Sequence, residues 1–261
     1  MPALLCTYLH IISEFMTDFR STRDISIRFV ICPLRVKLMG GLVYAVIGQQ
    51  LLSKMNTKLD RNPVILIHGI WDTKIIFSKM SSRLTELGWC VHSLNLTPND
   101  GSLGLASLAQ QLADYISQTF DPEQSIDIVG YSMGGLVSRY YVQRLGGINR
   151  VQRFITISSP HKGTLTAYSL PLPGYLDMRP HSNLLQDLDR DVAILKQINF
   201  TSIWTPFDVM ILPSDSSQMP VGKEVKLKVW LHRQMVTDTQ SINALVTELK
   251  APIKNKILIE K

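Results

Sequence analysis

A glycine-rich turn in the middle of this chain limits its fold more than any other feature. The run Ile126-Asp127-Ile128-Val129 has the β-branched residues of a buried strand and leads directly into Gly130-Tyr131-Ser132-Met133-Gly134-Gly135. A helix is expected directly afterwards, from Leu136 to Leu145. A passage this short leaves no room for side chains at Gly130 and Gly134. The segment therefore predicts a tight strand–turn–helix unit.

Segments typical of strands and helices alternate from residue 61 onward. Strands are expected at 63–68, 89–94, 125–129, 154–157, 202–205 and 225–231. Helices are expected at 73–87 (with Asp72 as its N-cap), 105–116, 136–145 and 242–249. This alternation predicts an α/β fold with a mostly parallel sheet of about six strands and helices on both faces.

Ser132 lies at the centre of the turn, in the pattern G-x-S-x-G, with a strand before it and a helix after it. This context is typical of the nucleophile of the α/β-hydrolase fold. The turn lifts the serine hydroxyl clear of the sheet and places it at a helix N-terminus, where developing negative charge is stabilised. The fold class predicted is therefore α/β-hydrolase, with Ser132 as the candidate nucleophile.

Acyl transfer also needs donors for the oxyanion of the tetrahedral intermediate. One is expected to be the backbone N–H of Met133, the residue after the nucleophile. The second is expected in the loop after the first strand, at His68-Gly69-Ile70, and Ile70 N–H is the candidate. His68 itself is interpreted as structural, bonding the loop backbone.

The general base is chosen by chain order, which in this fold runs serine, acid, histidine. Three of the six histidines precede Ser132 and are excluded: His10, His68 and His92. His161 has no acidic residue between it and Ser132, and His181 has only Asp177, which is too near. His232 remains, in a loop between the last expected strand and the last helix.

The acid must then lie between the serine and His232, on the loop after the preceding strand. Asp208 follows such a strand directly, and Asp215 is the reserve. Asp187, Asp189 and Asp191 are interpreted as solvated surface residues of a helix. In this triad Asp208 would orient His232, which would take the proton of Ser132, so kcat/KM should fall at acid pH as the imidazole protonates.

These motifs, together with Ser158-Ser159-Pro160-His161-Lys162-Gly163-Thr164, resemble the small bacterial triacylglycerol lipases and esterases of the α/β-hydrolase superfamily. The resemblance covers about residues 62–250. It implies hydrolysis of acyl esters without a metal or an organic cofactor, and a structural role for His161. The loop Ile70-Trp71-Asp72 departs from the small residues that these lipases often have there, which leaves the second oxyanion donor less defined.

The domain organisation predicted is an N-terminal extension, residues 1–60, and a hydrolase domain, 61–261. Three interpretations of the extension stay open: an interfacial membrane contact through residues 25–52, a helix packed on the core, and a misplaced start with the true one near Met55, which is favoured. Within the domain, the connection 163–200 is either a lid over the acyl site or an ordinary helix packed on it.

Composition argues against a nucleic-acid partner. The net charge is +6, but residues 1–62 carry 8 Lys/Arg against 4 Asp/Glu, so the rest is nearly neutral. The three cysteines have no metal or disulfide spacing, which favours a cytoplasmic location.

The predicted function is hydrolysis of a small-molecule or lipid carboxylic ester with an apolar acyl chain, through an acyl-serine intermediate. An acyltransferase or a thioesterase would share the same triad, and the sequence does not separate them. A non-catalytic binding protein of the same fold should have a damaged triad, and no damage is visible in the sequence.

Overall fold

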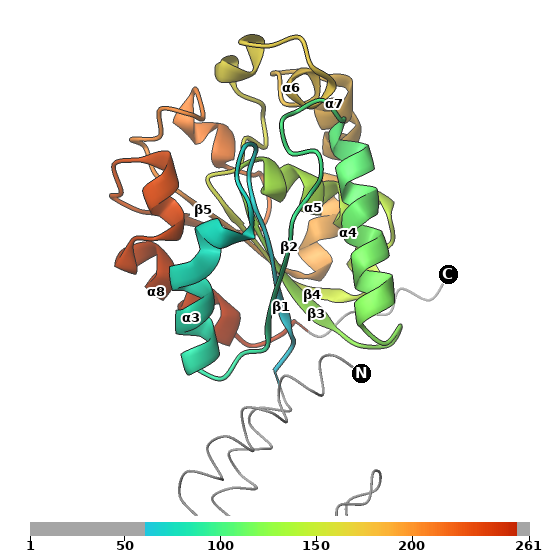
Figure 1. The fold of residues 1–261 in the computed structure, drawn as a ribbon, viewed down its shortest axis with the longest axis vertical. Helices are drawn as coiled ribbons and strands as arrows, with labels where there is room; N and C mark the ends of the chain where they lie inside the picture. The colour runs from blue at the N-terminus through green and yellow to red at the C-terminus, as the bar shows by residue number, and fades with distance from the viewer. Residues whose placement is uncertain (1–60, 255–261) are drawn as a thin grey trace, which may run out of the picture. The chain divides into compact units, whose positions relative to one another are not determined.

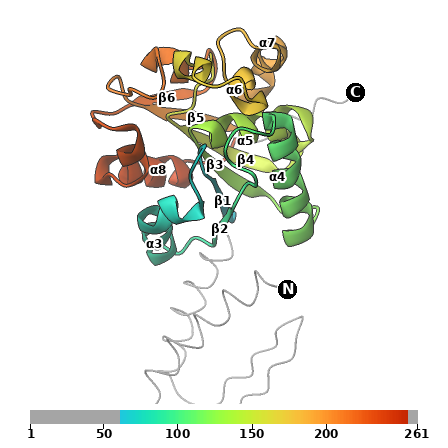
Figure 2. The same ribbon diagram turned by 45° about the horizontal axis from the view of Figure 1, so that its top comes forward.

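The computed structural model describes residues 61–254, and six strands among them form one sheet (Figures 1 and 2). The strands are β1 (Val64–Ile67), β2 (Val91–Leu94), β3 (Ile126–Tyr131), β4 (Val151–Ile157), β5 (Asn199–Trp204) and β6 (Lys223–Lys226). Their order is β2-β1-β3-β4-β5-β6, and every neighbouring pair is parallel. The predicted parallel sheet of about six strands is confirmed.

Helices follow the strands, as the alternating sequence predicts. Four of them cover the sheet: α3 (Ser78–Glu86), α4 (Leu105–Thr119), α5 (Met133–Arg144) and α8 (Thr239–Lys250). Two short ones precede β5, namely α6 (Pro173–Asp177) and α7 (Asn183–Arg190). The 3-10 turns are η1 (Lys74–Phe77), η2 (Gly147–Asn149), η3 (Leu165–Tyr168), η4 (Val192–Gln197), η5 (Ser214–Ser217) and η6 (His232–Val236).

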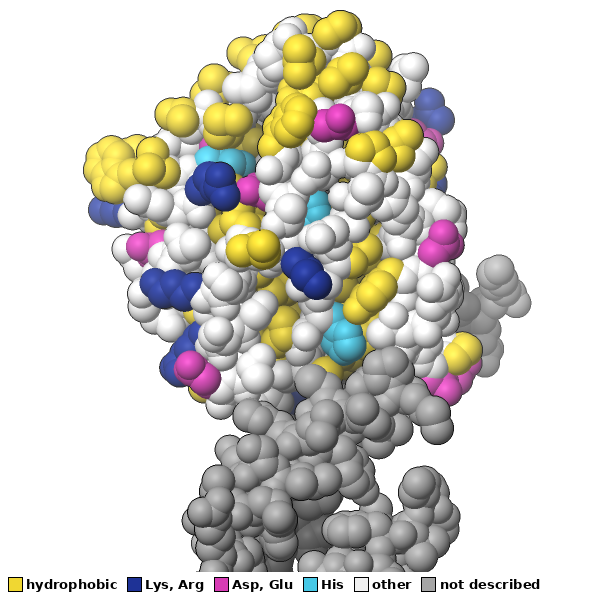
Figure 3. Space-filling view, in the orientation of Figure 1, with side chains coloured by type: hydrophobic (Ala, Val, Ile, Leu, Met, Phe, Trp, Pro, Cys, Tyr) yellow, Lys and Arg dark blue, Asp and Glu magenta, His cyan; other side chains and the backbone are white. Residues whose placement is uncertain are grey.

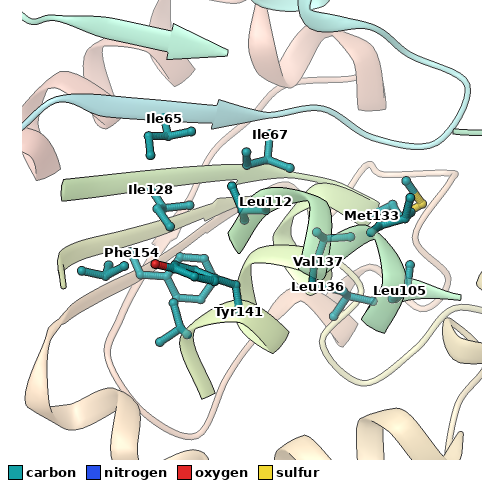
Figure 4. Packing of buried hydrophobic residues seen from close by; sticks show 14 of the residues in the cluster. Ile65, Ile67, Leu105, Leu112, Ile128, Met133, Leu136, Val137, Tyr141 and Phe154 are labelled. Carbon is teal, nitrogen blue, oxygen red and sulfur yellow. The ribbon is translucent and has the colours of Figure 1, made fainter. Parts of the chain in front are cut away.

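The sheet is buried on both faces, which explains why its central strands are continuously apolar. Alternate side chains of β1 enter different cores. Ile65 and Ile67 pack with α4 and α5 (Figure 4), whereas Val64 and Leu66 pack with α3 and α8. All four side chains are fully buried, and each such burial is worth about 1.5–3 kcal/mol. The two apolar layers fix the register of the strands that carry the site.

Several predicted boundaries are wrong: β4 and β5 each begin three residues before their predicted starts, at Val151 and Asn199. The last strand was expected at 225–231 but runs from Lys223 to Lys226, because β6 is an edge strand and its neighbour β5 ends at Trp204. Leu227 N still donates to Trp204 O (2.8 Å), beyond which β5 offers no partner. The first helix begins as η1, whose N-cap is Thr73 and not Asp72.

The connection 163–200 is attached to the domain at several points. Gly174 N donates to Gly101 O (2.9 Å), and Leu105 N donates to Asp177 Oδ2 (2.8 Å), which ties α6 to the start of α4. Leu165 N donates to Leu212 O (2.8 Å), which joins η3 to the loop after β5. Through these hydrogen bonds the segment 163–200 packs on the domain. That it moves as a lid stays a prediction.

The three aspartates interpreted as solvated surface residues are partly exposed, and each also forms an ion pair. Asp189 pairs with Arg139 (2.7 Å), and Arg144 pairs with both Asp187 and Asp191 (2.7 Å each). Their carboxylates are partly exposed, but the two arginines come from α5, so the pairs fasten α7 to it.

Several predictions concern residues outside those described. They are the extension 1–60 and its alternatives, the membrane contact through 25–52, and the positions of His10, Cys6 and Cys32. Among residues 61–254, none of the helices combines the length and the apolar character needed to span a bilayer.

Candidate active site

The candidate site lies where the order of the strands reverses. The chain passes from β1 to β2 at one edge and then crosses back to β3 on the other side of β1. In open parallel sheets such a reversal leaves a crevice at the carboxyl ends of the two central strands. Here those ends carry Gly69 after β1 and Ser132 after β3, and a Cβ at Gly69 would lie 3.0 Å from Ser132 Cβ. The topology thus brings the two motifs predicted from the sequence together.

The turn at Ser132 has the strained geometry that the glycines predict. Ser132 has φ 55° and ψ −125°, a left-handed value of φ that serine rarely adopts. A Cβ at Gly130 would lie 2.5 Å from Gly135 Cα, and one at Gly134 would overlap the carbonyl oxygens of the first strand's end. Only glycine fits at these two positions, so the turn holds Ser132 at the first turn of α5.

Hydrogen bonds join the three predicted triad residues in a line. His232 Nε2 lies 2.9 Å from Ser132 Oγ, and His232 Nδ1 lies 2.7 Å from Asp208 Oδ2. With the proton on Nδ1, the imidazole donates to Asp208 and accepts the hydroxyl proton of Ser132. The three residues are nearly buried, at 8%, 8% and 4% exposure for Ser132, His232 and Asp208. The arrangement can deprotonate the serine hydroxyl as it attacks a carbonyl.

Asp208 is held as a carboxylate by its surroundings. Burial is the largest effect and opposes its ionisation, but the hydrogen bond and charge of His232 act against it. The backbone N–H groups of Met210 and Ile211 also donate to Oδ1, at 2.9 and 3.0 Å. Together they hold the pKa of Asp208 below its usual value. Asp215, the reserve acid, is exposed on η5.

The two predicted oxyanion donors flank the serine. Met133 is the first residue of α5, and Ile70 follows Gly69 in the loop after β1. Within the described residues neither backbone N–H has a protein acceptor. Both are therefore free to donate to a bound carbonyl oxygen, and the dipole of α5 adds to the field there.

The excluded histidines have structural environments. His68 is fully buried, with Nδ1 2.8 Å from Gly69 O and Nε2 accepting from Leu96 N (3.0 Å). His161 is also fully buried, and its Nε2 lies 3.0 Å from Thr156 Oγ1. Burial lowers the pKa of both imidazoles, so both are neutral in the folded protein.

Acid should destabilise the fold through these neutral histidines. Below about pH 6.5 the unfolded chain binds protons that buried His161 cannot accept, so the free energy of unfolding falls as the pH falls. The slope is up to about 1.4 kcal/mol per pH unit for each such group. Urea midpoints measured at pH 7 and pH 5 should show a smaller loss for His161→Gln than for the wild type. Equal losses would exclude this role for His161.

Three residues to which the sequence analysis gave no role in the site lie beside the triad. The ring of Tyr131 lies against His232, with centroids 4.9 Å apart, and burial raises the pKa of its hydroxyl. Arg233, directly after the base, pairs with Asp72 of the Ile70 loop at 3.1 Å. Only adjacency to a predicted site residue could have indicated them.

Comparison with known proteins places this geometry in a known fold. Bacillus licheniformis lipase BlEst2 superposes with a TM-score of 0.58 at 13% identity, covering 73% of this chain and 93% of the lipase. Aspergillus fumigatus lipase B superposes with a TM-score of 0.62 at 18% identity, covering 74% of this chain and 53% of the lipase. At these identities the likeness shows the fold alone, and it confirms the α/β-hydrolase fold.

A Drosophila melanogaster protein described as a lysosomal thioesterase PPT2 homolog is 29% identical over 116 residues. These residues are 42% of this chain and 40% of the relative, so the match covers less than half of that protein. Its description gives no support to the cytoplasmic location expected from the cysteines.

The model of the palmitoyl protein thioesterase family matches residues 63–208, which is more than half of the chain. The matched range contains Ser132, both oxyanion candidates and Asp208, and it ends before His232. The resemblance to the α/β-hydrolase superfamily is thereby confirmed. The chain belongs to the palmitoyl protein thioesterase family.

Proposed function

We propose that this protein hydrolyses acyl thioesters with a long apolar acyl chain, using Ser132 as nucleophile, His232 as base and Asp208 as the acid that orients it. The hydrogen-bonded line from Asp208 through His232 to Ser132 carries the proposal, with contacts of 2.7 and 2.9 Å. The family supports a thioester as the substrate.

The chemistry follows from the geometry. His232 Nε2 takes the hydroxyl proton as Ser132 Oγ bonds to the carbonyl carbon, and the N–H groups of Ile70 and Met133 stabilise the resulting oxyanion. The intermediate collapses, the C–S bond breaks, and the sulfur leaves as a thiol with the proton from His232. Water then attacks the acyl-serine, gives its proton to His232, and releases the fatty acid as the proton returns to Ser132.

An apolar acyl chain fits the surface near the triad. Exposed hydrophobic side chains gather on the loops that follow β4 and β5 and on the loop that leads into His232: Leu165, Tyr168, Leu170, Leu176, Val209, Met210, Leu212, Trp230 and Leu231. Figure 3 shows hydrophobic side chains grouped at the end of the domain that carries α6. A cluster of this kind is typical of a surface that contacts an apolar ligand.

A carboxylic ester hydrolase is the second candidate, because the same triad opens an oxygen ester by the same steps. The fold shared with lipases supports it. An acyltransferase would differ only in the acceptor that replaces water. A non-catalytic binding protein would have no need of the ordered Ser132–His232–Asp208 line.

Matched substrates separate these functions. The wild type should hydrolyse N-acetylcysteamine thioesters with higher kcat/KM than the N-acetylethanolamine oxygen esters of the same acyl chain. For each acyl length, C4, C8 and C16, product acid is measured directly. Each methylene that reaches an apolar wall contributes up to about 0.8 kcal/mol, or about fourfold in kcat/KM. The value of kcat/KM should therefore rise with the length of the acyl chain.

A fluorophosphonate label provides the control that does not depend on the leaving group. Labelling together with a higher kcat/KM for the oxygen esters would support the carboxylic ester hydrolase instead. Labelling without release of free acid, but with transfer of the acyl group to an added thiol or alcohol acceptor, would support an acyltransferase. A folded protein that neither labels nor hydrolyses either series would contradict every catalytic proposal.

A further inference from the structure

An ion pair joins the loop that carries Ile70 to the segment that carries His232. Asp72 Oδ1 lies 3.1 Å from Arg233 Nη2. Asp72 is two residues after the oxyanion candidate, and Arg233 directly follows the base. We propose that Asp72 and Arg233 form a positioning pair, which holds the Ile70 N–H and the His232 imidazole in register on either side of Ser132. This inference rests on the proposed function.

The Ile70 loop needs such support because its backbone is strained. Trp71 has φ 60°, a left-handed conformation that is costly for a bulky residue. Its N–H donates to Asn99 O (2.9 Å) and its indole to the hydroxyl of Tyr175 (2.8 Å), while the Asn99 side-chain amide donates to Asp72 O. These bonds fix the loop to its neighbours after β2 and in α6. The Asp72–Arg233 pair links the loop to the segment that carries His232.

The pair is asymmetric, and this distinguishes it from an ordinary surface ion pair. The side chain of Asp72 is 11% exposed, whereas that of Arg233 is 76% exposed. Exposed pairs contribute little, about 0–1 kcal/mol, because water solvates both partners. Here the carboxylate is largely removed from water and depends on the guanidinium for compensation. Losing Arg233 would remove both this compensation and the link between the Ile70 loop and the segment that carries His232.

Asp72 also acts on the charges of the site. The groups that face it are Arg233, His68, His232 and Tyr131. Burial raises the pKa of Asp72, and the positive charge of Arg233 opposes this shift most strongly. Without Arg233, the pKa of Asp72 should rise further, because the positive charge that opposes the effect of burial is lost.

Four variants of the full chain test the pair: Asp72→Asn, Arg233→Gln, the double variant, and Arg233→Lys as the conservative replacement. Arg83→Gln is the matched control, because Arg83 pairs with Glu86 on α3 (3.2 Å) as an exposed ion pair. Each is assayed for kcat and KM from pH 5 to pH 9 on the best substrate of the wild type, with urea unfolding alongside.

When catalytic groups are misplaced by a fraction of an ångström, kcat falls more than substrate binding weakens. Each single variant should therefore lose about 10- to 100-fold in kcat, with KM within about twofold. The double variant should lose no more than the worse single variant, since both break one interaction. Arg233→Lys should recover most of kcat.

The proposal is overturned if kcat of Arg233→Gln matches that of Arg83→Gln, or if the two single losses multiply in the double variant. Because Arg233 is exposed, its variants can be judged even where Asp72→Asn does not fold. A wild type without hydrolysis or fluorophosphonate labelling would instead contradict the proposed function. The two failures are therefore distinguishable.

Discussion

Replacing Ser132 by alanine should reduce kcat/KM by about 10⁶-fold and abolish fluorophosphonate labelling, because no other group can form the acyl intermediate. The hydroxyl is 2.9 Å from His232 Nε2, in a turn whose backbone places it at the start of α5. Alanine has the same Cβ, so it adds no steric clash in that strained turn. The thermal midpoint should therefore stay within about 2 °C of the wild type.

Matched variants test whether the loss of activity is specific to Ser132 and its predicted partners. Ser117→Ala removes an exposed hydroxyl on α4 that donates to Asp114 O, and it should leave kcat unchanged. Asp208→Asn should lower kcat by about 10⁴-fold, because the amide favours the wrong tautomer of His232. Asp215→Asn, in the reserve acid, should have no effect. Activity in folded Ser132→Ala, or a larger loss in Asp215→Asn than in Asp208→Asn, would contradict this assignment of roles.

The parts of the fold that the sequence predicts are those determined locally. The turn around Ser132 is readable because two glycines, a strand and a helix are all close in the chain, and sterics alone demand glycine there. The parallel sheet is readable because strands buried on both faces must be continuously apolar. The end of the edge strand β6 is not readable, since it depends on where β5 ends.

The candidate triad was assembled from chain order, and the structure brings its three members together. Their catalytic roles stay predictions until the substitutions above are made. Chain order is informative because parallel strands all end at one edge of the sheet, so residues that follow different strands converge. No comparable rule predicts the Asp72–Arg233 pair from the sequence. The pair joins loops that are distant in sequence, and no periodicity indicates that Asp72 faces Arg233 rather than caps a helix.

Asp187 and Asp189 are a second case in which the sequence does not indicate the partners of a side chain. Here the difference affects the stability of the fold. Asp187 and Asp189 look equivalent in the sequence, as polar positions of one short helix. In the structure Asp189 is the carboxylate partner of Arg139, whose side chain is 0% exposed, whereas Asp187 pairs with Arg144, which is 23% exposed and keeps Asp191 as a second partner. Removing the carboxylate should therefore change the free energy of unfolding by different amounts at the two positions.

Replacing Asp189 by alanine should lower the free energy of unfolding by about 3 kcal/mol, because it removes the one carboxylate that accepts a hydrogen bond from the buried guanidinium of Arg139 among the described residues. The remaining hydrogen-bond partners of the Arg139 side chain are neutral: the carbonyl of Leu188 at 2.9 Å, that of His161 at 3.4 Å and the side chain of Gln143 at 2.8 Å. For a domain of about 200 residues this corresponds to a fall of about 6–12 °C in thermal midpoint.

Asp187→Ala is the matched control and should cost less than about 1 kcal/mol, since Arg144 keeps Asp191 and reaches water. The double variant Asp189→Ala/Arg139→Met should recover part of the loss, because it removes the buried charge while keeping an apolar side chain of similar length. Urea unfolding of the four proteins measures these differences. Equal losses for the two aspartates, or a double variant less stable than Asp189→Ala, would show that charge compensation at Arg139 does not fasten α7 to α5.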